Sequence, residues 1–109
     1  MEEFSEFKVS PLELRDGRAT ISVEGELDLY SSPELKAQLA ALPNDLQHLV
    51  LDLTGLTFID SAGLAVLVFA ARKLRGRGGS VRLTIGDHDI LKVMAITGFD
   101  RYFEIARPV

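Results

Sequence analysis

Residues 58–64, which read FIDSAGL, place a carboxylate and a hydroxyl side by side at Asp60 and Ser61. The pattern around them predicts a buried strand before this segment and an apolar helix after it. The free N–H groups and the dipole at a helix N-terminus favour a phosphate or another anion. Ser61 therefore has three candidate roles: a nucleophile, a helix cap or a phosphate acceptor.

A serine nucleophile of the hydrolase type needs the pattern G-x-S-x-G, because small flanking residues allow the sharp turn at the serine. Gly63 fits the last position of that pattern, but Ile59 occupies the first, so the match fails. The only histidines are His48 and His88, and neither lies in a recognisable triad motif. We expect His48, beside a core strand, to be structural. A serine–histidine enzyme remains a minor alternative.

Other candidate sites are better explained as parts of helices. Residues 87–89 (DHD) could suggest a metal site, but neighbours at a helix start do not face one another, and Asp87 or Asp89 suits an N-cap. Residues 76–79 (GRGG) lack the Gly-Lys-Ser/Thr of a phosphate loop and favour a helix C-cap. Nearby cations complement the helix dipole, and nucleic-acid binding is a poor second explanation for them. They are Arg72, Lys73, Arg75 and Arg77. We predict no metal and no cofactor.

The composition is that of one globular domain, with 109 residues of which 47% are apolar and 26% charged. A net charge of −4 argues against DNA or RNA as a direct partner. Cysteine is absent, which excludes disulfides, thiolate catalysis and zinc–thiolate sites. Residues 1–6 are acidic, are expected to be flexible and contain no apolar run of signal-peptide length. The most apolar run, 62–71, is about half the length that spans a bilayer. We expect a soluble cytoplasmic protein without membrane contact.

The first elements that position Ser61 follow from hydrophobic periodicity. Residues 7–14 predict a strand, and Ser10-Pro11 breaks its alternation as at a sheet edge or bulge. Asp16-Gly17 predicts a hairpin turn. A second strand follows, with alternate apolar residues on one face. These residues are Ala19, Ile21 and Val23.

A helix is predicted after these strands. Ser31 suits its N-cap, Pro33 its first turn, and Ser31 with Glu34 matches a capping box. We expect this helix to end near residues 43–44. Its core face consists of Leu35, Leu39 and Leu42. Residues 49–53 (LVLDL) form a nearly continuous apolar run, typical of a central strand covered on both faces.

The second half of the chain predicts a helix from Ser61 towards Gly76, a strand over 80–85 and a helix over 87–97 that stops at Gly98. A short segment closes the domain. The resulting order, β-β-α-β-α-β-α with a short final element, indicates an α/β fold. We predict a single domain over residues 1–109, with a mixed sheet of four to five strands and helices packed mainly on one face.

The helix after Ser61 is apolar on two faces. At about 100° per residue, one face gathers the residues expected to meet the core. They are Leu64, Leu67, Val68, Ala71 and Leu74. The opposite face gathers Ala62, Val66, Phe69 and Lys73. Val66 and Phe69 are then expected to be partly exposed, as a partner-docking surface or beneath another element of the domain.

Four segments, in order along the chain, resemble the STAS domains of bacterial anti-sigma factor antagonists. Residues 60–64 (DSAGL) resemble the D-S-x-G-L signature of that family, and residues 25–28 (GELD) resemble its G-E-L-D segment. Residues 49–53 are similar to its central strand, and residues 97–99 (TGF) to the end of its later helix. The resemblance covers residues 7–105. Four ordered segments are much more specific than a lone D-S-x-G.

The resemblance implies a STAS-like fold and a regulatory protein without catalysis of its own. Such antagonists bind an anti-sigma factor that is also a serine kinase, and thereby free a sigma factor. The kinase, which holds the ATP, phosphorylates the serine that corresponds to Ser61, and a serine phosphatase reverses the reaction. Asp28 and Asp60 correspond to family positions beside that serine. Ala62 stands where the family often has a second hydroxyl, so no neighbouring alternative acceptor exists.

The resemblance and the helix pattern together define a candidate partner-binding surface. It consists of Asp28, Asp60, Ser61, Ala62, Gly63, Val66 and Phe69. We expect a monomer or a weak dimer. An alternative keeps the fold but drops the switch, because STAS domains also serve as unphosphorylated modules of transport or larger signalling complexes. In such a module Ser61 would only cap its helix.

Overall fold

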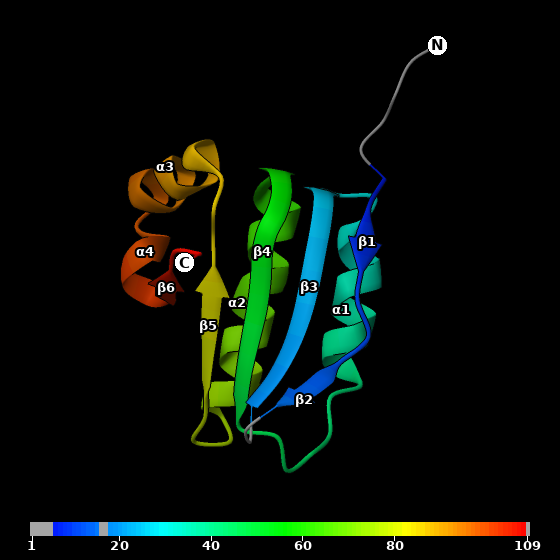
Figure 1. The fold of residues 1–109 in the computed structure, drawn as a ribbon. Coiled ribbons are helices and arrows are strands. Elements are labelled where there is room, and N and C mark those ends of the chain that lie inside the picture. Colours follow the sequence, from blue (N-terminus) through cyan, green and yellow to red (C-terminus); the bar gives the residue numbers. More distant parts are fainter. Residues whose placement is uncertain (1–5, 16–17, 109) are drawn as a thin grey trace.

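The computed structural model describes residues 6–15 and 18–108, and this part of the chain forms six strands and four helices (Figure 1). The strands are β1 (Lys8–Val9), β2 (Glu13–Arg15), β3 (Arg18–Leu27), β4 (His48–Ile59), β5 (Ser80–Thr84) and β6 (Glu104–Ala106). The helices are α1 (Ser32–Ala40), α2 (Ser61–Arg75), α3 (His88–Thr97) and α4 (Phe99–Tyr102). All strands belong to one mixed sheet in the order β1-β3-β4-β5-β6, with β2 also paired to β3.

Strands β1 and β2 are the two halves of the predicted broken edge strand. Both pair antiparallel with β3, and Pro11 lies between them. Ser10 bridges the break, because its N–H donates to the Ser22 carbonyl at 2.9 Å and its hydroxyl accepts from the Ser22 N–H at 2.8 Å. The predicted interruption is confirmed. The predicted turn at Asp16-Gly17 lies outside the described residues.

Strand β4 is the centre of the sheet and runs parallel to both β3 and β5. It has 12 residues, more than the apolar run at 49–53 predicted. The pairing shifts register twice, opposite Ser22–Glu24 and opposite Gly25–Glu26 of β3, with one extra residue on the β4 side each time, and β4 stays paired as far as Ile59. The strand therefore ends directly before Asp60, at the carboxyl edge of the sheet.

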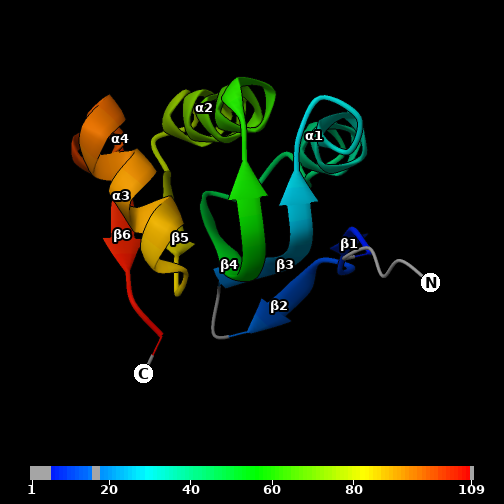
Figure 2. The same cartoon turned by 90° about the horizontal axis from the view of Figure 1, so that it is seen from above.

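Helices α1 and α2 lie side by side on one face of the sheet (Figure 2). The strand residues beneath them are fully or almost fully buried, and they include Ala19, Ile21, Val23, Leu49, Leu51 and Leu53. On the other face, Val50 and Asp52 remain partly exposed. Packing of the helices mainly on one face is confirmed. The expectation that the central strand is covered on both faces is wrong, because neither helix crosses to the open face.

Helix α1 buries Leu35 and Leu39 of the predicted face, and it ends at Ala40, before the expected end near residues 43–44, so the buried Leu42 lies just beyond it. Its predicted capping box does not form. The Ser31 hydroxyl turns back to the end of β3, where it donates to the Glu26 carbonyl at 2.7 Å and accepts from the Asp28 N–H at 2.9 Å. The Glu34 N–H instead donates to the Ser31 carbonyl at 3.1 Å.

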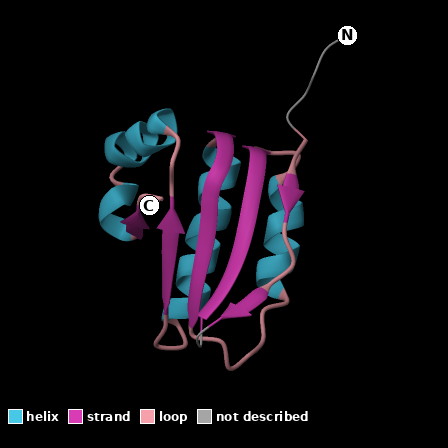
Figure 3. Cartoon of the chain, viewed as in Figure 1, coloured by secondary structure: helices cyan, strands magenta, loops and turns pink. Residues whose placement is uncertain are grey.

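The segment after β5 forms two helices and the strand at that edge of the sheet (Figure 3). Asp87 caps α3, since its carboxylate accepts from the N–H groups of Asp89 and Ile90 at 2.9 and 3.1 Å. Gly98 ends the helix in the left-handed region, with φ of +82°. Helix α4 and β6 then follow, and β6 pairs with β5. In the described part of the chain, every helix is too short or too polar to cross a membrane.

Candidate functional site

Ser61 is the first residue of α2, at the carboxyl edge of the sheet where β4 ends. The cap of this helix is Asp60, whose carboxylate Oδ1 accepts from the Gly63 N–H at 3.0 Å. Its carbonyl accepts from the Leu64 N–H at 2.9 Å. Ser61 is exposed, and its hydroxyl makes no hydrogen bond to any residue that the structure describes. Helix capping therefore does not explain why a serine stands at position 61.

The loop between β3 and α1 is fastened to the start of α2. Asp60 Oδ2 accepts from the Leu29 N–H at 3.1 Å, so one carboxylate joins the loop and the helix. Asp28 folds the same loop, because its Oδ1 accepts from the N–H groups of Tyr30 and Ser31 at 3.0 and 2.9 Å and from the Ser31 hydroxyl at 3.0 Å. Both predicted aspartates thus lie at one edge with Ser61.

The Asp28 carboxylate is stabilised by the donors around it. The Ser31 N–H is the main cause that holds the pKa of Asp28 below its usual value, and the Ser31 hydroxyl and the Tyr30 N–H act in the same direction. Partial burial acts in the opposite direction. Asp28 therefore remains charged down to a lower pH than a free aspartate.

Gly63 allows α2 to dock closely on the end of β3. A Cβ atom at this position would lie 2.5 Å from the Leu27 carbonyl oxygen and 2.7 Å from Ile59 Cγ1. The same carbonyl accepts from the Asp60 N–H at 3.2 Å. Gly63 is buried and has no side chain, so it shapes the site through the close packing that it allows.

The orientation of α2 differs from the prediction. Val66 is only 5% exposed, whereas Leu64 and Val68, assigned to the core face, are partly exposed. The expected exposure of Val66 is wrong, because α1 packs against that flank of α2. Phe69 is half-buried, and the Lys36 ammonium lies 5.2 Å from its ring centroid. The alternative that another element covers the strip is correct for Val66.

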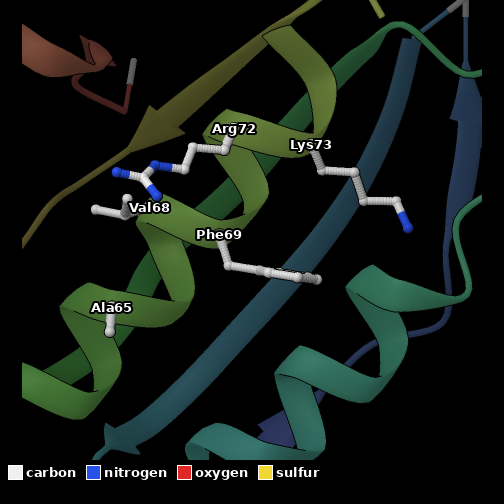
Figure 4. A pocket seen from close by; sticks show the side chains of 5 residues that line it. All are labelled: Ala65, Val68, Phe69, Arg72 and Lys73. Atoms are coloured by element: carbon white, nitrogen blue, oxygen red, sulfur yellow. The ribbon is translucent and has the colours of Figure 1, made fainter. Parts of the chain in front are cut away.

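The outward face of α2 instead continues from Ser61 through Ala65, Val68 and Arg72, which follow at helical spacing. A shallow hollow of about 670 Å³ runs along this face (Figure 4). We call it the α2 groove, and its lining residues are Ala65, Val68, Phe69, Arg72 and Lys73. The groove thus has an apolar floor with two cations at the end far from Ser61.

The cations of the α2 groove differ in their partners. Lys73 points towards α1, and its ammonium donates to the Ala40 carbonyl at 2.9 Å (Figure 4). Arg72 makes no hydrogen bond or ion pair within the described residues and lies on the other side of the helix from Lys73 (Figure 4). Arg72 is therefore the cation of the groove that the described residues leave unpaired.

Sequence reasoning missed three exposed apolar side chains at the same edge of the sheet. Leu29 and Tyr30, in the loop fastened by Asp60, are 65% and 90% exposed. Phe58, near the end of β4, is 47% exposed and pairs with Glu26 of β3. The signal was present in the sequence, because Leu29 and Tyr30 stand in the short loop between a strand and a helix, outside the apolar periodicity of both.

The histidines do not assemble with Ser61. His48 begins β4 and therefore lies at the opposite end of that strand, where its Nδ1 is 2.9 Å from the Ser80 hydroxyl. His88 is exposed at the start of α3, and within the described residues it makes no hydrogen bond to Ser61. The arrangement of a serine nucleophile with a histidine base is therefore not present at this site.

The family model for the Mlab, STAS domain matches residues 11–106. The chain belongs to the STAS domain family. This confirms the resemblance carried by the four segments of the sequence. The STAS domain is 29% identical over 86 residues to the anti-sigma-B factor antagonist of Bacillus subtilis, and the match covers 79% of each protein. It is 34% identical over 86 residues to the protein of the same name in Listeria monocytogenes, with 78% and 75% covered.

Solved structures share the fold of this STAS domain. An anti-sigma factor antagonist from Mycobacterium paratuberculosis gives a TM-score of 0.82 at 27% identity, with 93% of this chain and 86% of that chain covered. The anti-sigma factor antagonist SpoIIAA in its unphosphorylated form gives 0.72 at 19% identity, with 95% and 90% covered. The phosphorylated form of SpoIIAA, a Bacillus cell fate determinant, gives 0.71 at 18% identity, with 95% and 92% covered. At such identities the likeness to SpoIIAA shows the fold.

Proposed function

We propose that this STAS domain is an anti-sigma factor antagonist, which binds an anti-sigma factor and thereby releases a sigma factor. The observation that carries the proposal is the exposed hydroxyl of Ser61, which has no partner among the described residues and lies beside a loop that two aspartates hold in place. The names of its relatives in Bacillus and Listeria support the same role. The protein acts by binding alone, needs no cofactor and works in the bacterial cytoplasm as a monomer or weak dimer.

The docking surface consists of the carboxyl edge and the α2 groove. Leu29, Tyr30 and Phe58 supply exposed apolar area at the edge, and Ala62 lies next to the acceptor. An aromatic-rich patch of this kind, bordered by polar groups, is typical of a protein–protein contact. Asp28 and Asp60 act through the loop they fasten, and Phe69 contributes its exposed part.

Phosphorylation at Ser61 switches the protein off. The partner is a serine kinase that binds ATP itself, and it transfers the phosphoryl group to the exposed hydroxyl. Within the described residues, the N–H groups of Ser61 and Ala62 have no acceptor, so they are available to a phosphate at the helix N-terminus. The fold can therefore accept the modification without rearrangement.

The added charge explains the loss of binding. A phosphoserine carries about −1.5 to −2 charges at neutral pH. Asp60 and Asp28 already make this edge acidic, so an interface formed around a neutral hydroxyl would lose roughly 1–3 kcal/mol, or about 5- to 150-fold in affinity. A serine phosphatase removes the phosphate and restores binding.

The test is incubation of the STAS domain with candidate anti-sigma kinases and ATP, followed by intact mass measurement and site mapping. We expect one phosphoryl group per chain, located on Ser61, and none on the Ser61→Ala variant. A cognate kinase that binds the protein but leaves it unmodified, or that modifies Ser61→Ala equally, would contradict the proposed switch.

A second candidate function is a constitutive interaction module of a transport or signalling complex. The observation that favours it is the description of the matching family, Mlab, STAS domain. Ser61 would then contribute only a small polar side chain to a permanent interface. The two functions differ in two results, because a constitutive module gains no phosphate and binds its partner equally well with alanine or aspartate at position 61.

A further inference from the structure

A cluster of basic side chains lies on the open face of the sheet, at the end of β4 opposite to Ser61. Arg18 and His48 directly precede Ala19 and Leu49, which pair across β3 and β4, and His48 pairs with Ser80 of β5. The side chains of Ala19 and Leu49 are buried under the helices, so by strand alternation Arg18, His48 and Ser80 point to the open face.

A second row of the same face adds another cation and its partner. Arg82 of β5 pairs with Glu104 of β6 in the sheet. The Arg82 guanidinium donates to Glu104 Oε1 from Nε at 3.0 Å and from Nη2 at 2.7 Å. Both donors meet the same oxygen, so this contact leaves Nη1 of the guanidinium available.

The two rows enclose a small cavity of about 130 Å³. Its polar lining consists of Arg18, His48, Ser80, Arg82 and Glu104. The Ser80 hydroxyl and His48 Nδ1 are 2.9 Å apart, so the hydroxyl and the imidazole hold each other in position. The cavity is smaller than the roughly 300–1,000 Å³ of ordinary organic-ligand sites, which suits a small ion better than a nucleotide.

The charges around the cavity are unbalanced. Arg15 of β2 lies directly opposite Arg18, and like charges opposite one another destabilise a sheet. Glu104 is the only carboxylate in the lining among the described residues, and it is already paired with Arg82. Glu13, also on β2, lies opposite Thr20. An anion between Arg18 and Arg82 would relieve this repulsion.

We propose that this cavity binds a small phosphate-type oxyanion, either inorganic phosphate or the terminal phosphate of a monoester. Guanidinium groups match the geometry of phosphate oxygens. Arg18 comes from β3 and Arg82 from β5, the two strands that flank β4, and both line the cavity. The Ser80 hydroxyl supplies a neutral donor. The site is independent of Ser61 and of the proposed switch, since the two lie at opposite ends of β4.

The test is titration of the full chain with inorganic phosphate, followed by ¹H–¹⁵N NMR at constant ionic strength set with sodium chloride. We expect saturable shifts at the N–H groups of His48, Ser80 and Arg82, and none with chloride alone. Arg18→Gln and Arg82→Gln should each weaken binding about tenfold or more. Arg101→Gln, a change at an exposed arginine on α4, should leave it unchanged.

Glu104→Gln gives a prediction of opposite sign, because it removes the competing carboxylate and should strengthen binding about three- to tenfold. O-phosphoserine distinguishes the sources: tighter binding than phosphate indicates a phosphorylated ligand, and weaker binding indicates the free ion. Linear, non-saturating shifts, equal effects of Arg82→Gln and Arg101→Gln, or shifts confined to the start of α2 would each overturn the proposal.

Discussion

The carboxylates of Asp60 and Asp28 accept hydrogen bonds from backbone N–H groups of the chain itself. Asp60 holds the start of α2 and the N–H of Leu29, and Asp28 closes the turn that follows β3. Ser61 lies between these groups, and no residue in the described part of the chain hydrogen-bonds its exposed hydroxyl. These hydrogen bonds preorganise the carboxyl edge, which favours the proposed partner binding because little ordering remains to be done.

The lowered pKa of Asp28 predicts a specific dependence of stability on pH. A carboxylate whose pKa is depressed in the folded state stabilises the fold above its unfolded pKa, and this contribution is lost as pH falls through the folded value. The difference in unfolding free energy between the native protein and Asp28→Ala should therefore be largest above about pH 5 and shrink below about pH 4. Urea unfolding across this range measures it. A difference that stays constant with pH would contradict the assigned hydrogen bonds.

Gly63→Ala should destabilise the domain by about 1–3 kcal/mol, because its methyl group would collide with the Leu27 carbonyl oxygen. Gly86→Ala is the matched control, since a Cβ there would meet nothing closer than Pro108 Cγ at 3.4 Å. Urea unfolding of both variants measures the loss in the free energy of unfolding. Equal stability of the two variants would show that α2 does not need its close approach to β3.

At the scale of elements, α2 determines which surface the domain presents. Its buried side is set by two contacts at once, with the sheet below and with α1 beside it. The flank that includes Val66 is therefore covered, and the side that begins at Ser61 and continues through Ala65 and Val68 is free. Ser61 and the α2 groove consequently form one continuous surface along the helix.

A pair of variants tests this orientation. Val66→Ala should lower the free energy of unfolding by about 1.5–3 kcal/mol, because it opens a cavity between α1 and α2. Ala65→Glu, one residue away on the exposed side, should leave stability within about 0.5 kcal/mol. If Ala65→Glu unfolds the domain while Val66→Ala does not, the orientation of α2 is wrong.

Most elements could be predicted from the sequence because their signals are local. The alternation of Ala19, Ile21 and Val23, the cap at Asp87 and the stop at Gly98 each depend on a few neighbouring residues. The rotation of α2 could not be predicted, since the periodicity of an apolar helix does not tell which flank a neighbouring helix covers. The role of the Ser31 hydroxyl was missed for a similar reason, because its partners lie at the end of β3.

The candidate site was predicted in part. Asp28, Asp60 and Ser61 lie together as expected, because their positions follow from the ends of two adjacent parallel strands. The exposure of Leu29 and Tyr30 depends on the path of the loop, and the depth of Val66 depends on α1. Both depend on tertiary packing, which the spacing of residues along the sequence does not reveal.

At the scale of the whole molecule, the sheet is covered on one side only. Helices α1 and α2 bury its upper face in Figure 2, and the opposite face carries polar and charged side chains such as Asp52 and Arg82. The domain thus has two separate polar regions, the edge around Ser61 and the cluster of basic side chains at the other end of β4. A change in one region is not expected to alter the other.

Neighbouring residues of β4 test this one-sided arrangement. Leu51 is fully buried under the helices, so Leu51→Ala should lower the free energy of unfolding by about 2–5 kcal/mol. Val50 is partly exposed on the open face, and Val50→Ala should cost about 1 kcal/mol or less. Thermal and urea unfolding give both values. Similar losses at the two positions would indicate that the open face is covered as well.

The central claim is that the charge state of Ser61 controls partner binding, and its most direct test is a binding measurement. The protein, its form phosphorylated at Ser61 and its Ser61→Ala variant are titrated calorimetrically with the anti-sigma kinase that modifies it. We predict that Ser61→Ala binds as the unmodified protein does, and that the phosphorylated form binds about 5- to 150-fold more weakly. Equal affinity of the phosphorylated and unmodified forms would contradict the account.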